Sequence, residues 1–154
     1  MPKRSAGLLL YRRTQGFPEV LLVHPGGPFW AKKDKGAWTI PKGEYPDDEA
    51  PLAAAIREFT EETGFPVQEP FLPLGTIKQA GGKLVSAWAF EGDCDPARLV
   101  SNTFAMEWPP RSGRMIETPE VDRARWFSLA EAAESILPSQ SPLLDKLAHS
   151  LRQS

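Results

Sequence analysis

The sequence predicts an α/β fold in which strands and helices are mixed along one chain. Three observations predict it: short apolar runs of strand length are separated by polar turns, residues 51–63 have the spacing of a helix, and a second helical pattern ends the chain. Of the 154 residues, 41% are hydrophobic, which is enough to build the core of one domain.

The N-terminal part predicts a hairpin followed by a loop. Residues 6–11 and 20–24 are apolar runs, and the polar segment between them contains glycine and proline, as turns do. Residues 24–38 are rich in Gly, Pro and Lys and have no periodicity, which predicts a surface loop of the kind that carries binding groups.

A helix is predicted over residues 51–63. The first of these residues is a proline, which suits the first turn of a helix, and Gly64 suits the end. Apolar or small side chains recur there three or four residues apart, on one side of a helix: Leu52, Ile56, Phe59 and Thr63.

The second half of the chain predicts further strands and two helices. Strands are expected at 75–79 and 84–90, on either side of a Gly-Gly turn, at 104–108, where apolar residues alternate, and at 123–127. Ser128 and Glu131 form a capping box for a helix that runs to about Ile136. The last helix begins at Ser141 and carries leucines along one side.

The composition argues against several functional classes. The formal net charge is -2 and the pI is about 5.7, so a nucleic-acid polymer is not an expected partner. Cys94 is the one cysteine, which excludes an intramolecular disulfide and favours a cytoplasmic location. Arg12 and Arg13 end the first apolar run too early for a signal peptide, and no run has the length of a membrane span. His24 and His149 lack a partner motif, so no zinc or triad role is expected.

The helix at 51–63 also carries three glutamates on another side. At about 100° per residue, Glu58, Glu61 and Glu62 cluster well away from the apolar side chains. Carboxylates held together repel one another unless a cation lies between them, and hard oxygen ligands suit Mg²⁺ or Mn²⁺. The alternative is an ordinary solvated surface, since glutamate is a good helix former.

The context of these glutamates resembles the signature of the Nudix hydrolase family. That signature runs Gly, five residues, Glu, seven residues, Arg-Glu, an apolar residue, any residue, Glu-Glu, any residue, Gly, an apolar residue. The chain fills these places without a gap, using Gly43, Glu49, Arg57, Glu58, Phe59, Glu61, Glu62, Gly64 and Phe65.

The resemblance implies a fold and a reaction. The fold is an α/β/α sandwich with a central mixed β-sheet, expected to span residues 1–154 as one domain. The reaction is hydrolysis of a diphosphate linkage in a nucleotide derivative, with Mg²⁺ or Mn²⁺ as cofactor. The alternative from another class is a non-catalytic nucleotide-binding module, which would be expected to have lost signature carboxylates; none is lost here.

The resemblance also assigns the metal ligands. Glu58, Glu61 and Glu62 occupy the places whose carboxylates bind divalent metals and serve catalysis in the family. Gly43 occupies a place whose backbone carbonyl commonly adds a ligand, and the missing side chain permits close approach.

Three further residues are assigned supporting roles. Arg57 and Glu49 occupy places that pair with each other and hold the loop against the helix. Lys42, next to the signature glycine, either contacts a substrate phosphate or is simply solvated.

A general base outside the signature is also implied, because a late glutamate often fills this role in the family. Glu120 is the favoured residue, since it precedes Trp126 by six residues, a spacing similar to that of the family's diadenosine-polyphosphate hydrolases. Glu117 and Glu107 are the alternatives.

The signature leaves the substrate open. Trp30, beside Phe29 in the Gly/Pro loop, is expected to stack on a base, as its neighbour could. Arg111 and Arg114 either contact phosphates or are simply part of an exposed loop. A dinucleoside polyphosphate is favoured, and oxidised nucleoside triphosphates and nucleotide sugars are the alternatives. The expected partner is therefore a small molecule, and the sequence does not indicate an oligomeric state.

Overall fold

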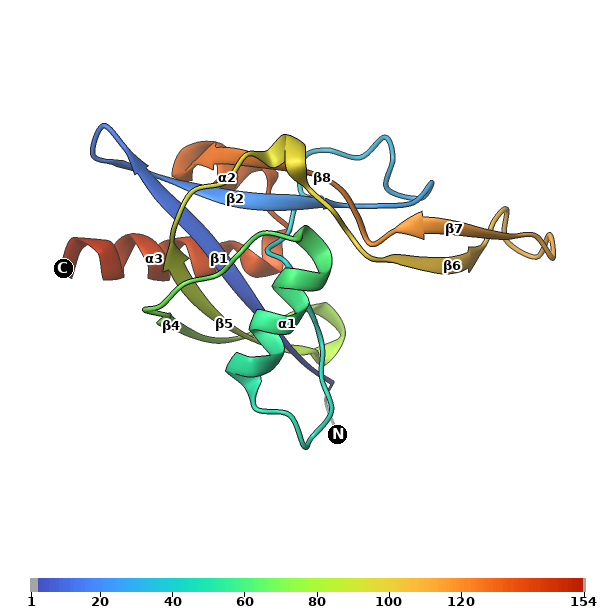
Figure 1. Ribbon diagram of the computed structural model, residues 1–154, viewed down its shortest axis with the longest axis horizontal. Coiled ribbons are helices and arrows are strands. Elements are labelled where there is room, and N and C mark those ends of the chain that lie inside the picture. The colour runs from blue at the N-terminus through green and yellow to red at the C-terminus, as the bar shows by residue number, and fades with distance from the viewer. Residues whose placement is uncertain (1–2, 154) are drawn as a thin grey trace.

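A six-stranded sheet packed between helices forms the body of the protein, as the computed structural model of residues 3–153 shows (Figure 1). The sheet order is β4-β5-β1-β2-β8, and β3 also pairs with β1. The elements are β1 (Arg4–Thr14), β2 (Phe17–Pro25), β3 (Lys42–Glu44), α1 (Pro51–Thr63), β4 (Leu72–Lys78), β5 (Leu84–Glu91), β6 (Thr103–Glu107), β7 (Met115–Pro119), β8 (Val121–Ser128), α2 (Leu129–Ser135) and α3 (Ser141–Gln153).

Strand β1 is the centre of this sheet. One of its edges pairs in parallel with the whole of β5, and the other pairs antiparallel with β3 and then with β2. The remaining pairs, β2 with β8 and β4 with β5, are antiparallel. The sheet is therefore mixed, as the family resemblance implies.

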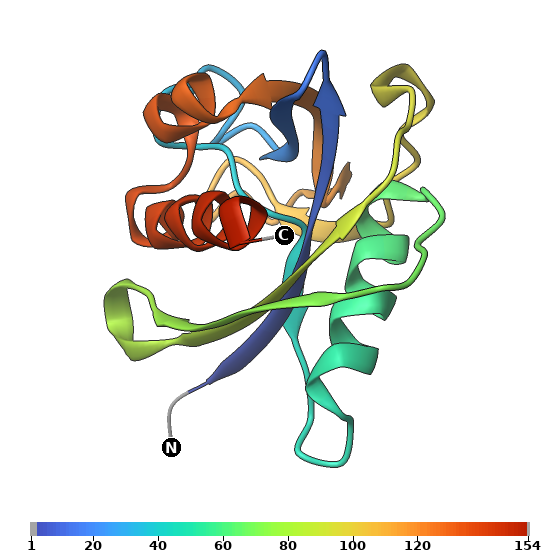
Figure 2. The ribbon, with the colours of Figure 1, turned by 90° about the vertical axis from the view of Figure 1, so that its left-hand side faces the viewer.

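Helices cover both faces of the sheet, with α1 on one side and α2 and α3 on the other (Figure 2). Successive side chains of a strand point to opposite faces, so β1 contributes to both cores. Leu8 and Leu10 pack in the core beneath α1, whereas Leu9 and Tyr11 pack in the core beneath α3. This arrangement confirms the predicted α/β/α sandwich.

The main sequence-based element predictions are confirmed, although several strands are longer than expected. The helix over residues 51–63 has the predicted bounds, and Gly64 ends it in the left-handed conformation at φ 73°. Ser128 and Glu131 form the predicted capping box, but α2 ends at Ser135. No helix among residues 3–153 combines the length and the apolar character needed to cross a membrane.

Two strands have no counterpart in the sequence analysis. Strand β3 has three residues, too few to show an alternating pattern, and it exists because it pairs with β1. Strand β7 pairs with β6 in a separate two-stranded sheet, which projects from the body of the molecule (Figure 1). The sequence of β7, Met-Ile-Glu-Thr-Pro, does not alternate between apolar and polar residues, whereas the alternation in β6 predicted that strand although it is mostly exposed.

A buried glutamine fixes the segment that leads into β3. Gln140, at the end of a 3-10 turn at Pro138–Gln140, is fully buried, and its side-chain oxygen accepts a hydrogen bond of 3.0 Å from the backbone N–H of Ile40. Trp38 is tied to the same region, since its carbonyl accepts from the backbone N–H of Leu137 at 2.7 Å. The link between α2 and α3 therefore supports the backbone just before Lys42.

We predict that Gln140→Met lowers the free energy of unfolding by about 1–3 kcal/mol, because the buried N–H of Ile40 loses its acceptor while the side chain keeps a similar length. Urea unfolding followed by circular dichroism measures this loss. Gln153→Met, at an exposed position near the end of α3, is the control and should change stability by less than about 0.5 kcal/mol. Equal stabilities of the two variants would contradict the assignment.

Candidate metal centre

Helix α1 presents two of its glutamates toward the sheet. Ala54, Ala55 and Phe59 are fully buried, and the Phe59 ring packs edge-on against Phe90 of β5 at 5.3 Å. This buried face is rotated from the predicted one, since Leu52 and Ile56 are only partly buried. The two alanines allow a close approach of helix to sheet, and the rotation carries acidic side chains into the interface.

Three carboxylates from two distant segments meet beside this interface. Ligand atoms of Glu58, Glu62 and Glu120 all lie within 4.8 Å of one another. Glu58 and Glu62 are 8% and 6% exposed, so both are buried on the inner side of α1 and do not project into solvent. They lie next to the apolar face, and the expectation that they lie well away from it is wrong.

Glu61, the third predicted ligand on α1, has a different immediate partner. Its carboxylate accepts hydrogen bonds of 3.3 and 3.2 Å from Arg57. Its charge still acts on the cluster, because burial and then the charge of Glu61 raise the pKa of Glu120. Glu61 therefore lies at the edge of the group formed by the other three carboxylates.

Arg57 connects the cluster to the preceding loop. Its guanidinium donates two hydrogen bonds to Glu49, at 2.9 and 2.8 Å, and one to Glu58 at 3.0 Å. The hydrogen bond from Arg57 lowers the pKa of Glu49, and the same contact contributes most to raising the pKa of Arg57. A bidentate pair of this kind fixes the loop before α1 against the helix.

Ionisation of the clustered carboxylates is energetically unfavourable. Burial, followed by the charges of Glu120 and Glu58, raises the pKa of Glu62 to about 9. Burial is also the first cause of the raised pKa of Glu58 and of Glu120. A cation among these oxygens would offset both the repulsion and the loss of solvation.

Gly43 leaves room for this cluster. It lies in β3, opposite Ala6 of β1. A Cβ atom at this position would lie 2.2 Å from the carboxylate carbon of Glu58, closer than any real contact. A larger residue here would displace the Glu58 carboxylate, so the reason for the glycine is close approach and not a positive φ.

These residues fit a hard divalent cation. Carboxylate oxygens are the ligands that Mg²⁺ and Mn²⁺ prefer, and here three carboxylates converge with no lysine or arginine salt bridge to Glu62 or Glu120 among residues 3–153. Glu58, Glu62 and Glu120 are the residues that would hold the ion. The absence of a Cβ at Gly43 leaves room for the Glu58 carboxylate in this group.

A pocket of about 260 Å³ opens beside the cluster. Its lining residues are Pro25, Trp30, Ala37, Thr39, Lys42, Glu62, Glu120, Val121 and Leu137. Four predicted site residues, Trp30, Lys42, Glu62 and Glu120, are therefore brought together. Burial lowers the pKa of Lys42, and the charges of Glu62, Glu44 and Glu58 oppose that shift.

Backbone contacts hold Glu120 at this pocket. Its carbonyl accepts from Gly26 N–H at 3.0 Å, and its own N–H donates to the carbonyl of Asn102 at 2.8 Å. Asn102 N–H in turn donates to the carbonyl of Glu61 at 2.8 Å. The end of α1 and the segment after β7 are thus linked through one residue.

The two alternative bases lie in the β6–β7 hairpin. Glu107 accepts hydrogen bonds from the backbone N–H groups of Arg111 and Gly113, at 2.9 and 3.1 Å. Glu117 accepts from the Thr103 hydroxyl across the hairpin. Neither belongs to the carboxylate cluster, which contains Glu120.

Arg111 and Arg114 lie in the exposed turn that joins β6 to β7. Neither lines the pocket. At about 3.4 Å per residue, the five-residue strand β7 separates this turn from the pocket by roughly 17 Å. The structure does not bring these arginines together with the other predicted site residues.

Several pocket residues have no signal in the sequence analysis. Leu137 and Val121 come from segments remote from the signature, and only the tertiary fold brings them to the pocket. Thr39 lies three residues before Lys42, and this proximity is the one feature of the sequence that indicates a place near the site. Cys94 lies elsewhere as a half-buried free thiol whose pKa is raised by burial to about 11.

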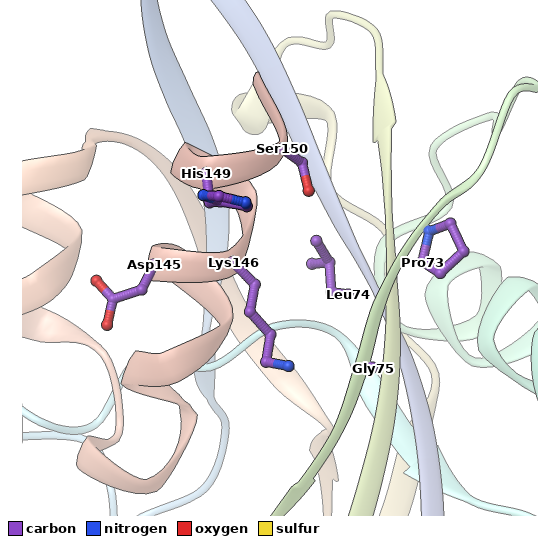
Figure 3. A pocket seen from close by; sticks show the side chains of 7 residues that line it. All are labelled: Pro73, Leu74, Gly75, Asp145, Lys146, His149 and Ser150. Carbon is purple, nitrogen blue, oxygen red and sulfur yellow. The ribbon is translucent and has the colours of Figure 1, made fainter. Parts of the chain in front are cut away.

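Another hollow, of about 440 Å³, lies on the opposite face of the sheet between β4 and α3. Figure 3 shows Lys146 extending from α3 toward Gly75, with His149 and Ser150 farther along the helix. None of the clustered glutamates lines it. The carboxylate cluster therefore identifies the pocket beside α1 as the candidate site.

Comparison with known families identifies the domain that this chain forms. A family model described as the NUDIX domain matches residues 1–147, which is nearly the whole chain.

Solved structures with a similar fold come from several organisms. A Caenorhabditis elegans Ap4A hydrolase in a binary complex is 24% identical, with a TM-score of 0.63 and coverage of 99% of each chain. The NUDIX domain of Shewanella oneidensis NrtR, in complex with ADP ribose, is 18% identical, with a TM-score of 0.68, 98% of this chain covered and 89% of that chain. The C-terminal domain of mouse MUTYH, in complex with human PCNA, is 18% identical, with a TM-score of 0.61, 100% of this chain covered and 92% of that chain. At these identities the likeness is one of fold.

We predict that Gly43→Ala weakens Mn²⁺ binding at least about tenfold, because the added methyl group displaces the Glu58 carboxylate. Isothermal titration calorimetry measures the affinity. Gly92→Ala is the control, since its Cβ would come no closer than 3.3 Å to any side chain, the nearest being Leu10, and none of its neighbours is a clustered carboxylate. Unchanged Mn²⁺ affinity in a folded Gly43→Ala variant would contradict the proposed position of the ion.

Proposed function

The chain belongs to the Nudix hydrolase family of pyrophosphohydrolases, and on this basis we propose that it uses Mg²⁺ or Mn²⁺ to cleave a diphosphate linkage in a nucleotide derivative with water. The observation that carries the proposal is the meeting of Glu58, Glu62 and Glu120. Two of these carboxylates, Glu62 and Glu120, also line a pocket together with Lys42 and Trp30. A divalent ion supplies charge neutralisation for a diphosphate and lowers the pKa of water.

The residues of the chain have distinct proposed roles. Glu58 and Glu62 hold the ion from α1, and the backbone of Gly43 lies close enough to contribute. Glu61 lies at the edge of this group and adds negative charge beside the ion. Glu120 either completes the ligand set or removes the proton of the attacking water, which its position beside the pocket supports.

Two other lining residues suit the rest of a nucleotide. Lys42 provides a positive charge for a phosphate oxygen, and the flat ring of Trp30 provides a stacking surface. At about 260 Å³ the pocket is smaller than the roughly 300–1,000 Å³ of typical ligand sites. It therefore suits one end of a substrate whose phosphate chain crosses the carboxylate cluster.

We favour dinucleoside polyphosphates as substrates. The spacing of Glu120 and Trp126 supports this class, and the fold likeness to a structure described as an Ap4A hydrolase makes it the first class to assay. ADP-ribose, oxidised nucleoside triphosphates and nucleotide sugars complete the panel. Incubation with Mg²⁺ in ¹⁸O-labelled water, followed by mass spectrometry, identifies the product that carries the label and hence the phosphorus attacked.

We predict that Glu62→Gln and Glu61→Gln each lower kcat at least about a hundredfold on the best substrate of this panel, and that Glu120→Gln has a smaller effect and a changed pH profile. Glu134→Gln, exposed on α2, is the control and should retain wild-type turnover. Near-native turnover of both Glu62→Gln and Glu61→Gln would end the metal-cluster proposal. An unchanged pH profile in Glu120→Gln would remove it as the base.

Trp30→Ala should raise KM about tenfold with kcat within about threefold, because a stacked base loses its contact. Phe29→Ala is a matched control: this neighbour is 56% exposed and does not line the pocket. Steady-state kinetics on one dinucleoside substrate compares the two variants. A KM that responds equally to both substitutions would show that Trp30 has no specific role.

A further inference from the structure

A third hollow lies at the tip of the β1–β2 hairpin, and its volume is about 510 Å³. The hairpin tip, the start of α2 and the end of α3 border it, and its lining residues are Arg13, Gly16, Phe17, Pro18, Leu129, Ala148, Leu151 and Arg152. The hairpin tip and the end of α3 lie on the same side of the molecule (Figure 1). None of the clustered glutamates lines this hollow, so it is separate from the candidate metal centre.

The register of the hairpin explains why its tip faces α3. Tyr11 of β1 pairs with Val20 of β2, and both lie in the core beneath α3. Side chains alternate between the two faces of a sheet, so the next pair on the same face, Arg13 with Pro18, points to that side as well. Gly16, at φ 86°, closes the turn between the strands. The hairpin therefore extends beyond the core on the side that α3 covers.

Apolar side chains form most of the lining of this hollow. Leu129 and Leu151 are partly buried and pack against the core beneath α3, so they form its floor. Ala148 is half-buried on the same helix as Leu151, and Phe17 is 74% exposed at the rim. Apolar side chains that gather in one hollow, rather than lie scattered over the surface, mark binding sites.

Both charged residues of the lining are arginines. Arg152, in the last turn of α3, is exposed and forms no salt bridge with another of residues 3–153. Arg13 lies near Glu91, but its Nε is 3.9 Å from the carboxylate oxygen and the two side chains are 43% and 54% exposed, so this pair is weak. A guanidinium presents several N–H donors in a plane that matches a carboxylate. The polar part of the hollow is therefore complementary to an anion.

The size of the hollow suits a small molecule. Ligand sites have volumes of roughly 300–1,000 Å³, a mainly apolar lining and a few polar groups that fix the orientation of the ligand. At about 510 Å³ this hollow lies within that range, whereas the pocket beside the metal centre, at about 260 Å³, does not. The hollow between β4 and α3 is also large enough, but Asp145 and Lys146 give its lining charges of both signs.

We propose that the hollow at the hairpin tip binds a small amphipathic carboxylate. The apolar body of this ligand lies against Phe17, Leu129 and Leu151, and its carboxylate accepts hydrogen bonds from Arg13 and Arg152. The proposal does not depend on the hydrolase activity, because the hollow shares no lining residue with the pocket beside α1.

Octanoate, below the concentration at which it forms micelles, is the probe, and octanol is its uncharged analogue. Titrations followed by ¹H–¹⁵N nuclear magnetic resonance measure both affinities and locate the site. Octanoate should bind saturably and shift the amide signals of Gly16 and Ala148 most. Octanol should bind at least about tenfold more weakly, because it cannot form charge-assisted hydrogen bonds with the arginines.

A double variant tests the anion contact. Arg13→Gln combined with Arg152→Gln should weaken octanoate binding at least about tenfold and leave octanol binding within about twofold of the wild type. Loss of the fold would weaken both ligands, so this difference is specific to the charge. Arg98→Gln, at an exposed arginine that does not line the hollow, is the control and should change neither affinity.

A single variant tests the apolar contact. Phe17→Ala should weaken the binding of both ligands about fivefold, because the ring no longer covers their apolar part. The fold is expected to survive, since this side chain is 74% exposed. Phe104→Ala, at a phenylalanine of β6 that is 42% exposed and lies outside the hollow, is the matched control and should leave both affinities unchanged.

Three results would overturn the proposal. The first is the absence of saturable octanoate binding, and the second is equal affinity of the wild type for octanoate and octanol. The third is a stable dimer in sedimentation analysis that Phe17→Ala dissociates, because a second copy of the chain would then occupy the hollow.

Discussion

Three carboxylates that repel one another lie within 4.8 Å in this protein. The elements that carry them are positioned by apolar packing and by backbone hydrogen bonds. Phe59 and two alanines dock α1 on the sheet, and Glu58 and Glu62 are buried as a consequence. Glu120 lies between β7 and β8, and backbone hydrogen bonds to Gly26 and Asn102 hold it in place. The free energy of apolar packing and backbone hydrogen bonding thus offsets the electrostatic cost of assembling the site.

Much of the fold and part of the site could be predicted from the sequence, because both follow from local periodicity. A helix fixes the angle between successive residues, so the grouping of Glu58 with Glu62 follows once the helix is identified. The rotation of the helix could not be predicted in the same way. Leucine and isoleucine are the obvious core residues, yet the two alanines face the sheet because small side chains allow the closest approach.

The less predictable features depend on contacts between distant segments. Strand β3 exists only through pairing with β1, and Leu137 lines the pocket because Trp38 and the α2–α3 link share backbone hydrogen bonds. For Arg111 and Arg114, contacts between distant segments exclude a role that the sequence suggested. Their charge suggested phosphate contacts, but the pairing of β6 with β7 carries them to an exposed turn, away from the pocket.

The central position of β1 has a consequence for how the chain acquires its structure. This strand uses both edges and both faces, and each residue that it pairs with in β5 lies eighty positions later in the chain, as Leu84 does opposite Arg4. Pairing over so long a separation is slow, because the intervening chain must lose its freedom before the contact forms. During synthesis, the edge of β1 that pairs with β5 therefore stays without its strand partner until residue 91 has been made, and an unpaired strand edge of this kind is prone to aggregation.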